Sequence, residues 1–225
     1  AEAHPVSMLH ILHAKEGGAK IIVADPRFTR TAAKADHYVR LRSGSDIALI
    51  YGVMRHIFEN GWDDKKYIED RVYGMDKIRE ESMQWTADKV LDVTGVPDDQ
   101  VHLIAETMAK NKPSTVVWCM GQTQHTTGNA IVRAMCNLQL ALGNVGVSGG
   151  GTNIFRGHDN VQGATDVGPN PDSLPGYYGL AEGSWKHFAK AWGVDFEWIK
   201  KQYAPGMMGK PGMTVKALVT SEQDM

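Results

Sequence analysis

The segment Lys20-Ile21-Ile22-Val23-Ala24-Asp25-Pro26-Arg27 decides the fold of this 225-residue chain. Residues 20–24 form a short run rich in β-branched side chains, which is typical of a strand buried on both faces of a parallel sheet. Asp25-Pro26 ends that run, because proline lacks the N–H that would continue a ladder. A second run of the same kind, Thr115-Val116-Val117-Trp118-Cys119, stops at Met120-Gly121. Two such strands within a largely helical chain predict an α/β architecture.

Helical and extended segments alternate around these two strands. Apolar side chains recur at helical spacing over residues 5–15, 47–59, 65–72, 75–83, 86–93, 97–110, 129–142, 184–192 and 196–203. In the first of these helices, the expected apolar face carries Met8, Leu9, Ile11 and Leu12. Further strands are expected at residues 37–41 and 216–220, with a short turn or helix at 31–35. We therefore predict a Rossmann-like parallel sheet flanked by helices.

The second half of the chain changes character after Gly143. Residues 146–179 are rich in Gly, Pro, Asn and Asp and show little periodicity, so we expect a long irregular polar loop. This division predicts an α/β region over residues 1–145, with a helical insertion at about 63–112. Residues 146–225 are expected to form a loop-rich segment and the start of the next α/β element. The first residues show neither an initiator methionine nor a signal-peptide pattern, which suggests a piece of a longer protein.

Composition excludes several classes of partner and site. The formal net charge is −2 and no run of lysine or arginine stands out, so no nucleic-acid partner is indicated. No apolar stretch approaches the roughly 20 residues that span a bilayer. Two cysteines, Cys119 and Cys136, are too few for a disulfide framework and are expected to be small buried apolar groups. The histidines are scattered without metal-ligand spacing.

Three segments follow strands and carry polar residues that suit a ligand. Asp25 can accept hydrogen bonds from ribose hydroxyls, and Arg27 can meet a phosphate or stack on a base. A helix cap with a surface salt bridge explains the two residues equally well. Gly44 precedes a helix N-terminus that attracts negative charge, although Ser45 or Asp46 can simply cap that helix. Residues 120–125 offer neutral donors for a nucleotide diphosphate, or form a plain polar loop.

The stretch Asn153–Asp166 is the most polar loop of the chain. It contains Arg156, His158, two Asp and two Asn close to glycines. Functional residues concentrate in such loops. The planar guanidinium of Arg156 matches a small carboxylate with two hydrogen bonds. Dinucleotide-binding, phosphate-loop, nucleophile-elbow and zinc-protease motifs are absent, which disfavours an ordinary NAD or P-loop enzyme.

The pattern Asn-x-x-Arg-Gly-x-x-Asn-x-Gln-Gly at residues 153–163 resembles the formate dehydrogenase branch of the molybdopterin oxidoreductases. Four further segments match the family in order and approximate spacing: 25–27, 44–46, 120–124 and 142–146. Asp166-x-Gly168 and Leu174–Tyr177 continue the match. Segments 2–5, 25–30 and 156–158 look closest to the periplasmic, membrane-associated members.

The resemblance implies a role for each matching position. Arg156 matches the active-site arginine that orients formate beside the metal. Positions that hold the guanosine part of one cofactor molecule correspond to Ala24, Asp25, Arg27, Gly44 and Asp46, and positions near its phosphates to Glu2 and Ala3. A loop that contacts the pterin dinucleotide matches Met120, Gly121 and Gln124. His158 matches a cofactor-contacting position where other members carry glutamine.

The resemblance also implies cofactors and partners. The family binds bis-molybdopterin guanine dinucleotide with molybdenum or tungsten, and its 4Fe-4S cluster and metal ligand belong to an upstream segment that this chain lacks. Formate, an iron–sulfur electron-transfer subunit and a membrane cytochrome subunit are the implied partners, at the periplasmic side of the inner membrane or, alternatively, in the cytoplasm. The fragment alone is expected to be inactive. Two alternatives stay open: a sister oxidoreductase acting on nitrate or polysulfide, and a non-catalytic nucleotide-binding module.

Overall fold

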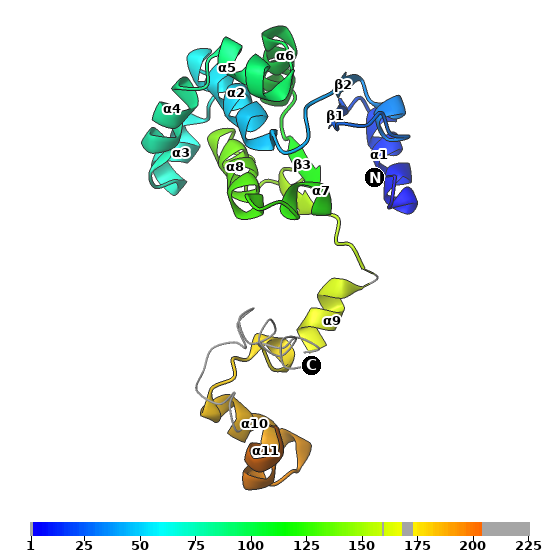
Figure 1. Cartoon of the computed structure of the whole chain (residues 1–225), viewed down its shortest axis with the longest axis vertical. Helices are drawn as coiled ribbons and strands as arrows, with labels where there is room; N and C mark the ends of the chain where they lie inside the picture. The colour runs from blue at the N-terminus through cyan, green and yellow to red at the C-terminus, as the bar shows by residue number, and fades with distance from the viewer. Residues whose placement is uncertain (1, 159, 168–172, 204–225) are drawn as a thin grey trace. The chain divides into compact units, whose positions relative to one another are not determined.

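The computed structural model describes residues 2–158, 160–167 and 173–203, which divide into two compact units between Phe155 and Arg156. The first unit contains all four named strands of this part of the chain. β1 (Ile22–Ala24) pairs in parallel with β2 (His37–Val39), and β3 (Thr115–Trp118) pairs in parallel with β4 (Gly151–Ile154). The predicted α/β class with parallel strands flanked by helices is therefore confirmed (Figure 1).

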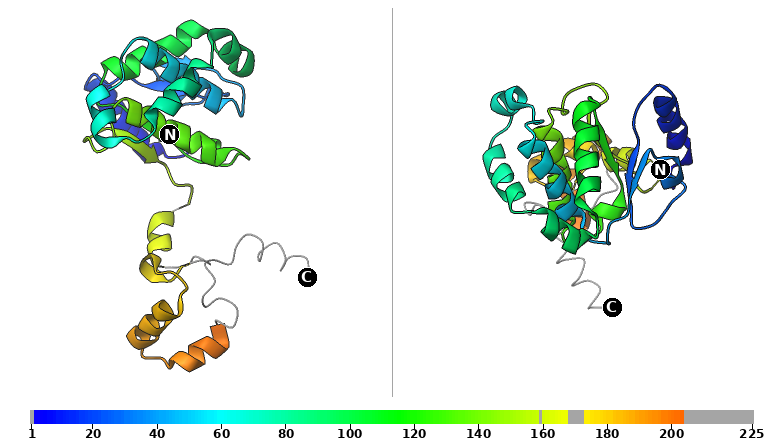
Figure 2. Two further views of the ribbon diagram at one scale, coloured as in Figure 1. Left: turned by 90° about the vertical axis from the view of Figure 1, so that its left-hand side faces the viewer. Right: turned by 90° about the horizontal axis from the view of Figure 1, so that it is seen from above.

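Helices make up most of the first unit. They are α1 (Pro5–Glu16), α2 (Asp46–Glu59), α3 (Lys65–Arg71), α4 (Met75–Met83), α5 (Ala87–Thr94), α6 (Asp98–Lys110), α7 (Met120–Thr123) and α8 (Gly128–Ala141), with a 3-10 turn η1 (Ala32–Lys34). The second unit contains α9 (Val161–Val167), a short turn η2 (Pro175–Tyr177), α10 (Glu182–Trp192) and α11 (Phe196–Tyr203). Figure 1 and the right-hand view of Figure 2 place α1 on the far side of β1 and β2 from helices α2 to α8.

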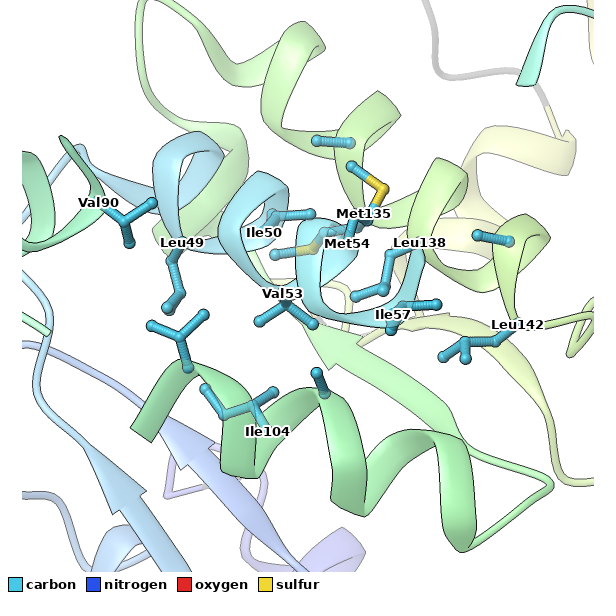
Figure 3. Packing of buried hydrophobic residues seen from close by; sticks show 14 of the residues in the cluster. Leu49, Ile50, Val53, Met54, Ile57, Val90, Ile104, Met135, Leu138 and Leu142 are labelled. Atoms are coloured by element: carbon cyan, nitrogen blue, oxygen red, sulfur yellow. The ribbon is translucent and has the colours of Figure 1, made fainter. Parts of the chain in front are cut away.

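The core of the first unit is built around α2. Met54 and Ile57 of this helix are fully buried, and they pack in one cluster with apolar side chains of α5, α6 and α8 (Figure 3). Gly52 allows the close approach of α5 and α6, because a Cβ there would lie 3.0 Å from Val90 Cγ2 and 3.2 Å from Val101 Cγ1. The second unit has its own small core of Leu174, Leu180, Trp185, Ala189 and Ile199.

Side-chain contacts fix the start of the first strand pair. The Asp36 carboxylate accepts a hydrogen bond of 2.8 Å from the Ile21 N–H, and its other oxygen lies 3.2 Å from Lys15 Nζ. The Ile21 N–H holds the pKa of Asp36 below its ordinary value, and Lys15 adds to this effect. These contacts connect the end of α1 to the start of β2 and so set the register in which β1 and β2 pair.

Several sequence expectations differ from the structure. The two strands expected to be buried on both faces, at 20–24 and 115–119, are only partly buried in β1 and β3. The expected apolar face of α1 buries no residue, and Leu9 is 57% exposed. The strands β1 and β3 border a cavity of the first unit, which leaves part of each without a covering neighbour, whereas α1 borders this cavity only at Ala14. Cys119 and Cys136 are half-buried free thiols rather than core residues, because each lies at the edge of the packed cluster.

The segment expected to be an irregular loop, residues 146–179, contains regular elements. Within its described part, β4, α9 and η2 form because tertiary pairing stabilises backbone that local sequence does not. Asn153 Nδ2 donates to Thr115 Oγ1 at 2.7 Å, and Thr115 Oγ1 donates to the Gly151 carbonyl at 3.1 Å. The expected strand at 216–220 lies outside the described residues. None of the helices in the described ranges is long and apolar enough to cross a bilayer.

Candidate functional site

The turn that follows β1 holds Asp25 in a fixed position. Asp25 Oδ1 accepts a hydrogen bond of 2.8 Å from the Arg27 N–H, and the Asp25 carbonyl accepts one of 2.9 Å from the Tyr38 hydroxyl. The Arg27 side chain is 75% exposed. The turn thus presents a fixed carboxylate beside a guanidinium that extends toward solvent, which is an arrangement suited to a nucleoside with an attached phosphate.

Glu2 reaches the same turn from a distant part of the sequence. Its Oε2 accepts a hydrogen bond of 2.9 Å from the Arg30 N–H and lies 3.9 Å from Arg27 Nη2. The structure therefore brings together Glu2, Asp25 and Arg27, three of the residues expected to bind a cofactor. Ala3 adjoins Glu2 in the chain, and Ala24 is the last residue of β1.

The Gly44-Ser45-Asp46 segment leads directly into α2. Gly44 has a φ of +80°, and a Cβ at this position would meet no atom within 4 Å, so open space borders the backbone. Of the two candidate caps, Ser45 occupies the N-cap position, but its side chain bonds to the preceding turn and not to α2: its hydroxyl donates to the Arg42 carbonyl at 2.6 Å. Asp46 becomes the first helical residue.

The segment after β3 forms one helical turn rather than an open loop. α7 begins at Met120, and the Gln124 N–H closes the turn on the Met120 carbonyl at 2.9 Å. A Cβ at Gly121 would meet no atom within 4 Å, and Met120 is 45% exposed. This turn presents the sequence-predicted Met120, Gly121 and Gln124 at the carboxyl end of a parallel strand, where α/β sheets bind ligands.

Residues 2–4 connect the carboxyl ends of the two strand pairs. Glu2 contacts Arg30, in the segment that follows β1, and the His4 ring lies 5.1 Å from the ring of Phe155, which directly follows β4. The Phe155 N–H in turn donates to the carbonyl of Trp118, the last residue of β3. The candidate residues of the first unit thus gather along one edge of its strands.

The second unit carries Arg156 in a separate group of polar side chains. The Tyr177 hydroxyl donates a hydrogen bond of 2.5 Å to Asp166 Oδ1, and this bond raises the pKa of Tyr177 above its ordinary value of 10.0. The positive charge of Arg156 acts on the pKa of Tyr177 in the opposite direction, so Arg156 lies within electrostatic range of the Tyr177 hydroxyl. His158 lies two residues beyond Arg156 in the same polar segment.

Sequence reasoning missed two tyrosines of these groups. Tyr38 holds the Asp25 carbonyl, and Tyr177, which has a φ of +62°, holds Asp166. Tyr38 lies in β2, the strand next to β1, and its place beside the strand that precedes Asp25 is a signal that the sequence offers. The sequence indicates Tyr177 only as part of the segment Leu174–Tyr177, which resembles the family. Within the residues that the structure describes, no three His, Cys, Asp or Glu side chains are grouped closely enough to hold a metal ion.

Replacing Asp166 with asparagine is expected to lower the pKa of Tyr177 toward 10.0. The bond exists only while the phenol carries its proton, so its contribution to stability is complete below the ordinary pKa and is lost as pH rises through the raised one. A pH titration of the chain with ¹³C-labelled tyrosine measures this pKa by NMR. Asp195→Asn, another acid of the second unit, serves as the control. An unchanged Tyr177 titration in Asp166→Asn would contradict the assignment.

Comparison with known proteins gives a consistent set of relatives. The sequence model of the molybdopterin oxidoreductase family matches residues 1–206. Formate dehydrogenase H of Escherichia coli is 39% identical over 196 residues, covering 87% of this chain and 27% of the relative. The F420-dependent formate dehydrogenase subunit alpha of Methanocaldococcus jannaschii is 36% identical over 217 residues, covering 96% of this chain and 32% of the relative.

A solved structure shares the fold as well as part of the sequence. Acetylene hydratase from Pelobacter acetylenicus superposes with a TM-score of 0.61 at 29% identity, covering 64% of this chain and 20% of the hydratase. This chain thus spans about a third or less of the length of each of these relatives.

Proposed function

This chain belongs to the molybdopterin oxidoreductase family, and from that premise we propose that it is part of the catalytic subunit of a formate dehydrogenase. The observation that carries the proposal is the 34–39% identity to formate dehydrogenase subunits over most of the chain. The hydratase that shares the fold is less similar and is covered over a smaller part of this chain. The relatives therefore favour oxidation of formate to carbon dioxide. We further propose that the electrons pass to iron–sulfur clusters.

The polar groups of the first unit fit the nucleotide part of a pterin guanine dinucleotide. The Asp25 carboxylate can accept hydrogen bonds from ribose hydroxyls, and the exposed Arg27 guanidinium can meet a phosphate or a base. Open space beside Gly44 and Gly121 lets a ligand approach the backbone closely, and neither glycine has a side chain in the way. We propose that Glu2, Ala3, Ala24, Asp46, Met120 and Gln124 complete this binding surface.

The second unit supplies the substrate contact in this proposal. Bound cofactor would provide the two-electron chemistry through its molybdenum or tungsten centre and its dithiolene sulfurs. In this proposal the chain binds and orients formate. Arg156 has the charge and the planar geometry to hold a carboxylate. The Tyr177–Asp166 hydrogen bond belongs to the same unit, and the charge of Arg156 acts on the Tyr177 hydroxyl. We propose that His158 contacts the cofactor.

Formate-dependent reduction of an artificial dye by the complete catalytic subunit, purified anaerobically, tests this function. We expect formate to reduce the dye. We expect nitrate and polysulfide to oxidise the reduced dye only poorly in the presence of the same enzyme. The isolated 225-residue chain is expected to be inactive. A preparation shown to contain metal and pterin, yet inactive with formate and active with nitrate or polysulfide, would transfer the assignment to a sister oxidoreductase. The iron–sulfur and membrane partners and the periplasmic location remain predictions.

A further inference from the structure

The C-terminal end of α5 lies against the linker that joins β2 to α2. The main-chain N–H of Arg42 donates to the Thr94 carbonyl at 2.9 Å, and Arg42 Nη1 donates to the Asp92 carbonyl. The guanidinium also lies close to Gly95, where a Cβ would be 3.6 Å from Arg42 Cζ. A single linker residue thus makes two hydrogen bonds to a helix end, and Asp92 is 50 positions away from it in the sequence.

These bonds complete a helix end that α5 cannot complete alone. The last four carbonyls of a helix have no partner within it. In α5, the Leu91 carbonyl accepts from the Gly95 N–H. Arg42 supplies the donors for two more of these carbonyls, those of Asp92 and Thr94. Its positive charge also meets the negative end of the helix dipole, so both geometry and charge hold Arg42 at this place.

The carbonyl of Arg42 anchors the turn that leads into α2. It accepts from the Ser45 N–H at 3.2 Å and from the Ser45 hydroxyl at 2.6 Å. Ser45 is only 6% exposed, and Gly44 within the turn has a φ of +80°. The end of α5, Arg42 and the turn at Gly44 consequently form one continuous chain of hydrogen bonds.

A cavity of about 500 Å³ lies between this turn and the one that follows β1. Its lining includes Pro26 of the Asp25 turn, the linker residues 40–43, and Thr94 and Gly95 at the end of α5. The end of α5 therefore borders the surface that we propose for the nucleotide part of the cofactor, although this helix belongs to the helical insertion.

A helix cap alone does not explain how Arg42 is used. A cap requires only donors, whereas here the carbonyl of the same residue holds a second element. Arg42 is attached through its N–H to Thr94, through its side chain to Asp92 and through its carbonyl to Ser45. Because all three groups belong to one residue, a displacement of the α5 end is transmitted directly to the turn at Gly44.

We propose that Arg42 is a positioning residue that couples the end of α5 to the turn at residues 44–46, so that the helical insertion stabilises the bound pterin guanine dinucleotide. Arg42 neither reacts nor contacts the substrate, and it acts through the hydrogen bonds to Ser45. This role rests on the proposed function, because it requires that the cofactor binds at the turn. It gives α5 a part in cofactor binding in addition to its part in the core.

Hydrogen exchange in the complete catalytic subunit tests whether Arg42 holds the turn. Arg42→Met keeps the apolar stem of the side chain but removes its donors and its charge. We expect the Ser45 amide to exchange at least about tenfold faster than in the parent protein, since the turn loses its anchor on α5. Arg42→Lys keeps a positively charged donor and should restore most of the protection. Arg40→Met removes an exposed arginine of the same linker and should leave the Ser45 amide unchanged.

Release of pterin and metal from the purified, loaded subunit tests whether the turn holds the cofactor. We expect release at least about fivefold faster from Arg42→Met, because couplings between sites change affinity about 5- to 150-fold. Arg42→Lys should release pterin nearly as slowly as the parent protein. Ser45→Ala removes one of the two donors to the Arg42 carbonyl and should also speed release. Turnover per bound metal and KM for formate should stay unchanged in all three variants, which a general loss of structure would not allow.

The remaining outcomes overturn the proposal in distinguishable ways. Unchanged release from Arg42→Met would show that the turn holds the cofactor without α5. Faster release that Arg42→Lys does not rescue, or that comes with an equal loss of turnover per metal, would leave Arg42 only a structural role. If Arg42→Met does not fold, unchanged release from Ser45→Ala would overturn the coupling. A parent subunit without pterin would overturn the proposed function, whereas exchange at Ser45 would still decide whether Arg42 holds the turn.

Discussion

Replacing Arg156 with alanine in the complete catalytic subunit is expected to raise the KM for formate roughly 10- to 150-fold. A hydrogen bond to a charged partner contributes about 1.5–3 kcal/mol, and each 1.36 kcal/mol corresponds to a factor of ten. The effect is expected mainly in KM, because the guanidinium holds the carboxylate of formate before and during the reaction. Initial rates of dye reduction over a range of formate concentrations measure it.

Two further variants distinguish a specific contact from a general loss of structure. Arg156→Lys keeps the positive charge but loses the planar pair of donors, so its KM should lie between those of the parent protein and Arg156→Ala. Arg133→Ala removes an exposed arginine of α8 in the first unit and should leave KM unchanged. Metal and pterin content must be normal in all three proteins. An unchanged KM in Arg156→Ala under those conditions would remove Arg156 from the substrate site.

The helical part of the fold could be predicted closely from sequence. Over residues 46–110 and 128–141, helix boundaries lie within a few residues of those expected, because apolar spacing records which face of each helix meets the core. β4 could not be predicted, since Gly151-Thr152-Asn153-Ile154 has neither strand composition nor alternation. Its pairing with β3 and the hydrogen bond from Asn153 to Thr115 stabilise it, and both are tertiary contacts.

The candidate site also has residues that the sequence predicts and contacts that it does not predict. Asp25 and Met120 could be found because each follows a strand-like run, and parallel strands present such residues at a common edge. The approach of Glu2 to Arg30 spans 28 positions of sequence, and nothing local predicts it. Likewise, the hydrogen bond between Tyr177 and Asp166 joins residues 11 positions apart, and nothing local predicts it. The sequence therefore indicates the residues at the carboxyl ends of the strands, whereas the contacts that hold those residues are seen only in the structure.

Replacing Ile57 with alanine is expected to lower the free energy of unfolding of the first unit by about 2–5 kcal/mol. Ile57 is fully buried on α2, and Figure 3 shows it near Leu138 of α8, within the cluster that connects α2 to its neighbours. Truncation removes three carbon atoms and leaves a cavity that rigid neighbouring helices can fill only in part. Equilibrium urea unfolding of the 225-residue chain, followed by far-ultraviolet circular dichroism, measures the change because the first unit contains most of the helix.

Two further substitutions distinguish the effect of the void left at Ile57 from the effect of removing apolar carbon atoms in general. Ile57→Val removes one carbon and should cost about 0.5–1.5 kcal/mol, in proportion to a smaller void. Leu91→Ala makes a larger truncation on α5, where the side chain is 45% exposed, and should change stability by only about 0.5 kcal/mol. This order follows from burial alone, since Leu91 and Ile57 are apolar residues of the same size on neighbouring helices. If Ile57→Ala cost no more than Leu91→Ala, α2 would not be the centre of the packed core.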